Sequence, residues 1–290
     1  MLKLGCLYGV LVPYFLHCDS VLLNSIGDFN KFYRGKVENF SFTNQIKGVC
    51  MNSCQQVVEG VYRIRGSRSN IYLIDDLGPV LIDTGMPGDE TVILQALLDL
   101  GFQWRDLRTI FITHAHLDHV GALAAVKAET GAAVVACMRE EEHIDGRRML
   151  CSMSREGLGG NVFRCILFIM EKFIQKYQPV HLDTPYCDEG GVGQMGGIEI
   201  ISTPGHSPGS LSFYYPKQKA IFTGDALTGM PAPGLPLRAG CSDYGQALRS
   251  VRRLAELNVD VCLFGHGEPL AVNAASVLCE LADRTDLLPG

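Results

Sequence analysis

His114-Ala115-His116-Leu117-Asp118-His119 places four side chains that can bind a metal within six consecutive residues. The apolar run Thr109–Thr113 comes directly before this stretch and predicts a buried strand, and Val120–Glu129 follows it and predicts a helix. The potential ligands therefore lie where an extended strand turns into a helix. Because imidazole and carboxylate are the ligands that zinc selects, the stretch predicts a metal site.

The two halves of this stretch are expected to face different ions. His114 and His116 alternate along an extended segment, so their side chains point the same way. Asp118 and His119 lie on the turn that follows, where they can reach a second ion. The pattern thus indicates two neighbouring metal sites.

Further potential ligands follow other predicted strands. Asp83, His206, Asp225 and His266 come after the strands Val80–Ile82, Ile198–Ser202, Ala220–Phe222 and Val261–Phe264, in that order. A glycine directly precedes the last three of these residues, which leaves room for an ion close to the backbone. We expect these four strand ends to converge on one edge of the fold.

Short strands and amphipathic helices alternate along the rest of the chain. The strands Val61–Arg65, Asn70–Ile74 and Val80–Ile82 predict a β-meander at its start. The alternation that follows predicts helices packed on the faces of sheets. The other expected elements are a helix from Pro87 to about Leu100, strands over Ala132–Cys137 and Leu211–Tyr215, a helix over Tyr244–Leu257 and a final helix over about Ala271–Ala282.

The chain is expected to divide into an extension over residues 1–50 and a compact domain over residues 51–290. The first fifty residues carry five basic and three acidic side chains, which reverses the charge sign of the remainder. We expect this extension to be poorly ordered or to precede the native start. Within the domain, an insertion over about residues 139–188 contains Val162–Tyr177, which has the apolar spacing of an amphipathic helix. This helix either adds to the core or forms a lid over a substrate pocket.

The composition excludes several classes of protein. A chain of 290 residues with 47% hydrophobic content can bury a large core, which excludes a disordered chain. Its net charge of -6 is a poor match for a polyanion, so we expect no nucleic-acid partner. Leu2–Cys18 is too short and too interrupted for a membrane span, so we expect no membrane partner.

The cysteines indicate the compartment. They number eleven, an odd count, and have no repeating spacing, which suits reduced thiols in a cytoplasmic protein better than a disulfide framework. The alternative is secretion, which would require residues 1–20 to act as a signal peptide.

The full set of potential ligands resembles the signature of the metallo-β-lactamase-fold superfamily. That signature is His-x-His-x-Asp-His, followed by a His, a bridging Asp and a last His, and the resemblance covers about residues 58–270. It implies an α+β fold, an αββα four-layer sandwich with the metals at one edge of its two sheets. It also implies that His114, His116 and His206 hold one ion, that Asp118, His119 and His266 hold the other, and that Asp225 bridges them. Asp83 matches a family carboxylate beside the site that holds the ligands in orientation.

The resemblance implies a binuclear metal-dependent hydrolase. Two divalent ions, zinc first with iron or manganese as alternatives, would share a bridging hydroxide that attacks an ester, thioester or lactone of a small molecule. Asp118 would also act in catalysis by taking a proton from the attacking water. A homodimer is left open.

Residues within the pattern separate the branches of the superfamily. Asp225, where the best-known dizinc β-lactamases have a cysteine, indicates the glyoxalase II, lactonase and general-hydrolase branches and makes β-lactam hydrolysis a further alternative. Thr228, where similar lactonases have a tyrosine, argues against a lactonase. A mononuclear iron oxidoreductase of the persulfide dioxygenase type is the main alternative, but His119 and His266 favour a filled second site.

Overall fold

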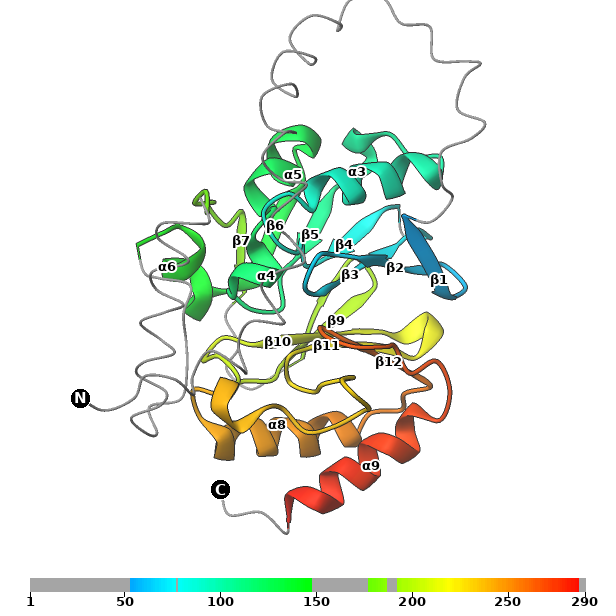
Figure 1. Cartoon of the computed structure of the whole chain (residues 1–290), viewed down its shortest axis with the longest axis vertical. Coiled ribbons are helices and arrows are strands. Elements are labelled where there is room, and N and C mark those ends of the chain that lie inside the picture. The colour runs from blue at the N-terminus through cyan, green and yellow to red at the C-terminus, as the bar shows by residue number, and fades with distance from the viewer. Residues whose placement is uncertain (1–52, 77, 148–176, 187–191, 287–290) are drawn as a thin grey trace, which may run out of the picture. The chain divides into compact units, whose positions relative to one another are not determined.

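The structure is a computed structural model that describes residues 53–76, 78–147, 177–186 and 192–286 (Figure 1). The expected extension over residues 1–50 and nearly all of the expected lid helix lie outside these residues. Among the described residues, no helix is long and apolar enough to cross a membrane.

The first sheet contains β1 to β7 in chain order. Neighbours from β2 to β4 are antiparallel, as expected for the meander, and β1, which was not expected, pairs antiparallel with β2. Neighbours from β4 to β7 are parallel. Its strands are β1 (Cys54–Val58), β2 (Val61–Arg65), β3 (Asn70–Ile74), β4 (Val80–Ile82), β5 (Thr109–Phe111), β6 (Ala133–Cys137) and β7 (Thr184–Tyr186).

The second sheet has the order β12-β11-β10-β9-β8. The pair β11 and β12 is parallel and the other neighbours are antiparallel. Its strands are β8 (Val192–Met195), β9 (Ile198–Ser202), β10 (Leu211–Tyr215), β11 (Ala220–Gly224) and β12 (Val261–Phe264).

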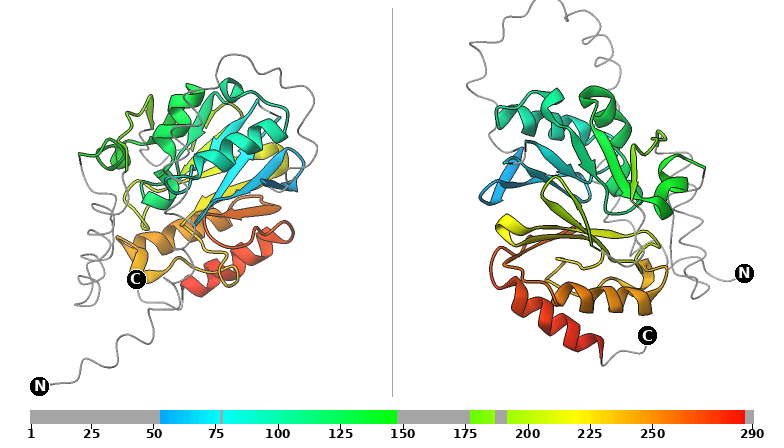
Figure 2. Two further views of the ribbon diagram at one scale, coloured as in Figure 1. Left: turned by 45° about the horizontal axis from the view of Figure 1, so that its top comes forward. Right: turned by 180° about the vertical axis from the view of Figure 1, so that it is seen from behind.

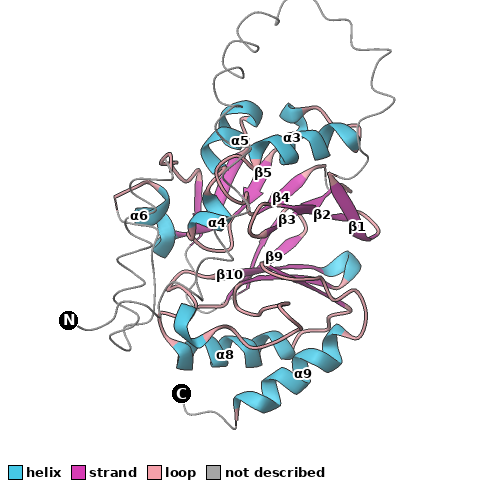
Figure 3. Ribbon diagram, viewed as in Figure 1, coloured by secondary structure: helices cyan, strands magenta, loops and turns pink. Residues whose placement is uncertain are grey.

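Helices cover the outer faces of both sheets, which gives the αββα sandwich (Figures 1 and 2). The α-helices are α3 (Glu90–Asp99), α4 (Leu117–Val120), α5 (Leu123–Thr130), α6 (Glu141–Ile144), α8 (Tyr244–Ala255) and α9 (Ala274–Thr285). The short 3-10 helices are η2 (Trp104–Asp106), η3 (Met138–Glu140), η4 (Pro216–Gln218) and η5 (Arg238–Gly240). In Figure 3, α3 and α5 lie on the far side of the first sheet from α8 and α9, which lie on the second.

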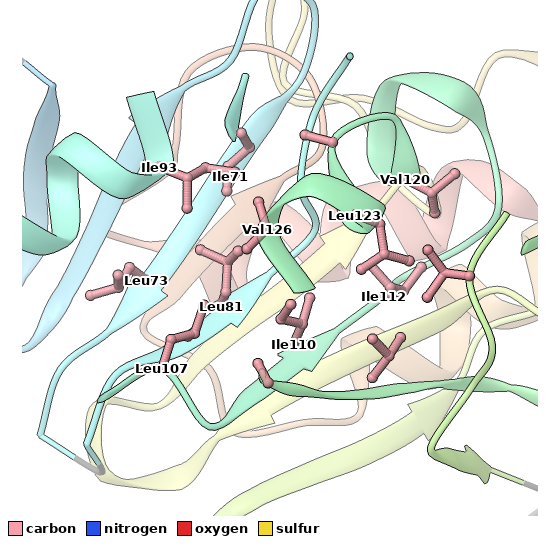
Figure 4. Close-up of a cluster of buried hydrophobic side chains, with 14 of the residues drawn as sticks. Ile71, Leu73, Leu81, Ile93, Leu107, Ile110, Ile112, Val120, Leu123 and Val126 are labelled. Atoms are coloured by element: carbon pink, nitrogen blue, oxygen red, sulfur yellow. The ribbon is translucent and has the colours of Figure 1, made fainter. Parts of the chain in front are cut away.

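β3 shows why the sheets lie inside the molecule. All five of its residues are buried, and its two faces belong to different cores. Ile71 and Leu73 join the cluster that includes residues of α3 and α5 (Figure 4). Tyr72 and Ile74 join the cluster between the two sheets. Each such fully buried side chain stabilises the fold by roughly 1.5–3 kcal/mol, so both faces of the sheet contribute.

The expected strand ends do converge on one edge of the sandwich. Register places the carboxyl ends of β4 and β5 together with the amino end of β3, and the carboxyl ends of β9, β11 and β12 together in the other sheet. Two backbone hydrogen bonds join the sheets at this edge. Asn70 N–H donates to Gly265 O at 2.7 Å, and Leu211 N–H donates to Thr113 O at 2.8 Å.

The expected helix over Val120–Glu129 is confirmed as α5, but it begins three residues later, at Leu123, because the short helix α4 ends at Val120. Gly121 separates them. Its N–H donates to Gly85 O at 2.7 Å, and a Cβ at this position would lie 2.3 Å from Pro87 Cδ. Only a residue without a side chain fits at Gly121, so the ligand-bearing turn packs closely on the turn that follows β4, and the helix is interrupted there.

Candidate metal centre

The seven potential ligands come from four separate parts of the chain and meet at the common edge. His114 and His116 precede α4, and Asp118 and His119 lie within it. The other three follow strands of the second sheet: His206 comes after β9, Asp225 directly after β11, and His266 after β12. Their ligand atoms form two groups, each within 4.8 Å: His114, His116, His206 and Asp225 in the first, and Asp118, His119 and His266 in the second.

Three ring nitrogens converge in the first group. His116 Nδ1 lies 3.0 Å from His114 Nε2 and 2.9 Å from His206 Nε2. Ligand nitrogens bound about 2.0–2.1 Å from a tetrahedral zinc ion lie about 3.3 Å from one another. The spacing of these three rings is thus close to that of ligands on one ion.

Asp225 lies between the two groups. Its Oδ2 is 3.4 Å from His206 Nε2 in the first group and 3.5 Å from His266 Nε2 in the second. Its Oδ1 is 3.5 Å from His119 Nε2. The second group is completed by Asp118, whose Oδ2 lies 3.3 Å from His266 Nε2.

Two buried polar atoms in this cluster have no hydrogen-bond partner among the described residues. They are His119 Nε2 and Asp225 Oδ1. Buried polar atoms are almost always satisfied, so an orphaned imidazole nitrogen facing an orphaned carboxylate oxygen needs a binding partner. A divalent cation satisfies both atoms, and the donor set fits such an ion.

Asp83 orients rings in both groups. It is 2% exposed and adopts a left-handed φ of 60°, which aims its carboxylate at the cluster. Asp83 Oδ2 lies 2.8 Å from His119 Nδ1 and accepts from Thr113 Oγ1 at 2.8 Å. Thr113 Oγ1 in turn lies 3.0 Å from His114 Nδ1. Holding Nδ1 of both rings leaves each Nε2 facing the site.

The protonation states also suit a cation. Burial, together with the neighbouring imidazoles of His119 and His116, lowers the pKa of His114 well below its ordinary value. Burial is likewise the largest cause that lowers the pKa of His206, to about 3. Burial alone would raise the pKa of Asp225, but the imidazoles of His119 and His206 outweigh it and hold that pKa well below its ordinary value. His114 and His206 are thus neutral and Asp225 is ionised, which are the metal-binding forms. Burial alone would lower the pKa values of His119 and His266, but the carboxylates beside them outweigh burial and raise those values to about 9 and about 11, so these two rings release a proton when an ion binds.

Residues 64–266 match the profile of the Metallo-beta-lactamase superfamily. The chain belongs to this superfamily. The match runs from the end of β2 through β12 to the last ligand, so it covers most of the first sheet, all of the second sheet and every residue of the candidate centre.

Superfamily relatives include hydrolases. The chain is similar to probable metallo-hydrolase YflN of Bacillus subtilis (strain 168), with 27% identity over 252 residues that cover 79% of this chain and 92% of that protein. It is also similar to hydroxyacylglutathione hydrolase GloC of Haemophilus influenzae, with 28% identity over 199 residues that cover 67% of this chain and 82% of that protein.

Solved structures of the superfamily share the fold. The metallo-beta-lactamase family protein TTHA1429 from Thermus thermophilus superposes with a TM-score of 0.60 and 25% identity, covering 80% of this chain and 81% of that chain. BJP-1, a subclass B3 metallo-beta-lactamase of Bradyrhizobium japonicum, superposes with a TM-score of 0.57 and 22% identity, covering 81% of this chain and 92% of that chain. The expected αββα fold is therefore confirmed, and the chain is a metallo-hydrolase of this superfamily with a His/Asp metal-binding cluster.

Sequence reasoning missed one buried side chain at the centre, Glu140 of η3. It is 2% exposed and links the segments that carry the first group. Its carboxylate accepts from Ala115 N–H at 3.2 Å, between the first two histidines. It also accepts from Ser207 Oγ at 2.8 Å and Gly209 N–H at 2.7 Å, just after His206. Its position three residues after the buried strand β6 is the one signal in the sequence that could have pointed to it.

Proposed function

We propose that this chain is a binuclear metal-dependent hydrolase that cleaves an ester-type bond, preferably a thioester, in a small molecule. In this proposal His114, His116 and His206 hold one ion, Asp118, His119 and His266 hold the other, and Asp225 bridges them. The observation that carries the proposal is the place of Asp225, whose carboxylate lies within 3.5 Å of ring nitrogens from both groups. A single-ion site has no need of a shared carboxylate.

When bound, a pair of divalent ions lowers the pKa of a shared water and polarises the carbonyl group under attack. In this proposal Asp118 takes the proton of that water. Burial alone would raise its pKa, but His119 and the hydrogen bond with His266 outweigh burial and hold that pKa far below the ordinary value, so the carboxylate is ionised before the reaction. It can then pass the proton to the leaving group as the bond between that group and the carbonyl carbon breaks.

Two observations favour a thioester within this class. The relatives named hydroxyacylglutathione hydrolase act on acylglutathiones, which are thioesters. A thiol also has a pKa near 8.5, so a thiolate leaves with less help from an acid than an alkoxide needs. We therefore assign thioesters to this chain from its similarity to these relatives and from the chemistry of the leaving group.

The test is hydrolysis by the full-length, zinc-loaded protein of three substrates with one acyl chain: a thioester, an aryl ester and a lactone. We expect the thioester to be cleaved with the highest kcat/KM. The loss of its ultraviolet absorbance measures the rate of cleavage. A chromogenic cephalosporin serves as the comparison for β-lactam hydrolysis and should be cleaved far more slowly. No cleavage of any ester-type substrate by protein with two ions bound would contradict the proposal. Oxygen uptake with a persulfide and one iron per chain would instead identify an oxidoreductase.

A further inference from the structure

A hollow of about 170 Å³ lies beside the second ligand group. Its walls are the turn between β2 and β3 and the segment after β12, which the sheet register places at the metal edge. The residues used below that line it are Arg63, Arg65, Arg68, Ser69, Gly267 and Glu268.

Two residues that line the hollow form hydrogen bonds with metal ligands. His266 Nδ1 donates to Arg68 O at 3.1 Å, and Gly267 follows His266 in the chain. Ser69 Oγ donates to the main-chain oxygen of Asp118. A group bound in the hollow would therefore sit next to a carbonyl held at the ions.

Positive charge dominates this hollow, because its lining contains three arginines and one carboxylate. Arg63 is 1% exposed and its Nη2 pairs with Glu268 at 2.8 Å, while Arg65 lies 3.6 Å from the same side chain. Arg63 Nε is buried and has no hydrogen-bond partner in the described part of the chain. Two arginines share Glu268, which leaves the hollow with unbalanced positive charge.

Arg68 differs from the other two arginines because its side chain is not engaged in holding the fold together. Its side chain is exposed, and within the described ranges it makes no hydrogen bond or ion pair. An arginine fork matches the oxygens of a carboxylate or a phosphate in geometry and in charge. The fold thus leaves one anion-binding fork at the rim of the hollow.

The size of the hollow limits what it can hold. Pockets that enclose a whole small-molecule ligand measure about 300–1,000 Å³. A hollow of about 170 Å³ instead suits one terminal group of a substrate whose scissile bond lies at the ions.

We propose that this hollow is a subsite for an anionic terminal group of the substrate, a carboxylate or a phosphate, and that Arg68 is its main specificity-determining residue. The proposal rests on the proposed function, since it assigns one end of the substrate of that hydrolase. Arg63 and Arg65 add charge from the wall, and Glu268 competes with the substrate for them.

The test is equilibrium binding of three stable thioethers to the full-length, zinc-loaded protein by calorimetric titration. The probes are 3-(butylsulfanyl)propanoate, 2-(butylsulfanyl)ethyl phosphate and the neutral 3-(butylsulfanyl)propan-1-ol. We expect at least one anionic probe to bind about tenfold or more tightly than the neutral one. The more tightly bound anion identifies the group as a carboxylate or a phosphate.

The variants separate the subsite from attraction to the ions themselves. Arg68→Ala should weaken binding of the preferred anion about tenfold and leave the neutral probe unchanged, while Arg68→Lys keeps part of the affinity. Arg105→Ala is the control, because it removes another exposed arginine, which lies before β5 and so at the end of the sheet opposite the metal edge. Glu268→Gln should strengthen binding of the anion, since it removes the competing carboxylate.

Anion binding that is the same in Arg68→Ala as in the wild type would overturn the proposal, and so would equal binding of all three probes. The thioethers contain no bond to hydrolyse, so their binding reports on the subsite whether or not thioesters are cleaved. Cleavage of a neutral thioester reports on the proposed function whether or not Arg68 matters.

Discussion

The two ligand groups differ in how the fold holds them. In the first group the rings of His114, His116 and His206 pack edge to face, with centroids 4.6–4.7 Å apart, and Glu140 ties their two segments together. In the second group the side chains of Asp118 and His266 are about one quarter exposed and lie beside the β2–β3 turn. The comparison teaches that one half of the centre is built as a fixed support and the other half faces the approaching substrate.

Removing the shared carboxylate should have the largest effect, because it weakens both groups at once. We expect Asp225→Asn to lower kcat/KM for the best thioester by at least about a thousandfold, since ion-mediated stabilisation of the transition state is worth several kcal/mol. Steady-state hydrolysis measures the loss, and an unchanged melting temperature shows that the variant folds. Activity within tenfold of the wild type would remove Asp225 from the centre.

Asp83→Asn should have the next largest effect and should also act on both groups. Asn tolerates the left-handed φ of 60°, so the backbone is kept while the carboxylate that reaches His119, and His114 through Thr113, is lost. Changes of this kind cost about 10- to 100-fold in metal affinity or activity. Zinc affinity is measured by competition with a chelator.

Thr84→Val is the control for this change. It removes a hydrogen bond to the main-chain oxygen of His119 but none to its ring, so we expect a smaller loss of zinc affinity. A loss as large as that of Asp83→Asn would show that packing around α4, rather than ring orientation, is responsible.

Glu140→Gln should separate the two groups. The amide cannot accept from Ala115 N–H, Ser207 Oγ and Gly209 N–H as the carboxylate does, so we expect the affinity of the first group to fall about tenfold. The stepwise dissociation constants for the two ions are the readout, with the neighbouring Glu141→Gln as the control. Equal weakening of both steps would contradict a fixed support specific to the first group.

The contribution of Asp76 to stability should depend on pH, and because Asp76 lies away from the metal centre, this dependence should not involve the ions. There Asp76 accepts hydrogen bonds from Tyr215 Oη and Lys217 Nζ. Burial alone would raise the pKa of Asp76, but these hydrogen bonds outweigh it and lower the pKa below 3.8. Because the folded-state pKa is the lower one, the stabilisation is complete above the unfolded pKa and is lost as pH falls through the folded-state value.

Asp76→Asn should therefore reduce the free energy of unfolding by about 1 kcal/mol or less at pH 7. Chemical denaturation across a pH series should show the difference from the wild type shrinking below about pH 4. Asp260→Asn, which removes a carboxylate that is 65% exposed, is the control and should show no such trend. A difference that grows on acidification would reverse the assigned sign.

Most of the strands and helices and all of the potential metal ligands could be predicted from local sequence patterns. The histidine stretch and the four polar strand ends are recognisable because each begins within four residues of the end of an apolar strand. β7 was not predicted because it is a three-residue edge strand with Pro185 at its centre, and β8 contains Gly193. Neither has the continuous apolar pattern of the central strands.

The residues that sequence reasoning did not assign act across long distances in the chain. Glu140 meets Ser207 and Gly209, whose separation from it is 67 and 69 residues. Arg68 lies next to His266 because the hydrogen bond from Asn70 to Gly265 joins two different sheets. Such contacts follow from the packing of the sheets, which no local pattern of polar residues specifies.

Metal content is the most direct test of the central claim. Elemental analysis of full-length wild-type protein and Asp225→Asn, both purified from unsupplemented medium, counts the ions per chain. The account predicts two zinc or zinc-like ions per wild-type chain and at most one in the variant. A single iron per wild-type chain, or no metal after titration with zinc, would contradict a binuclear centre held by these seven residues.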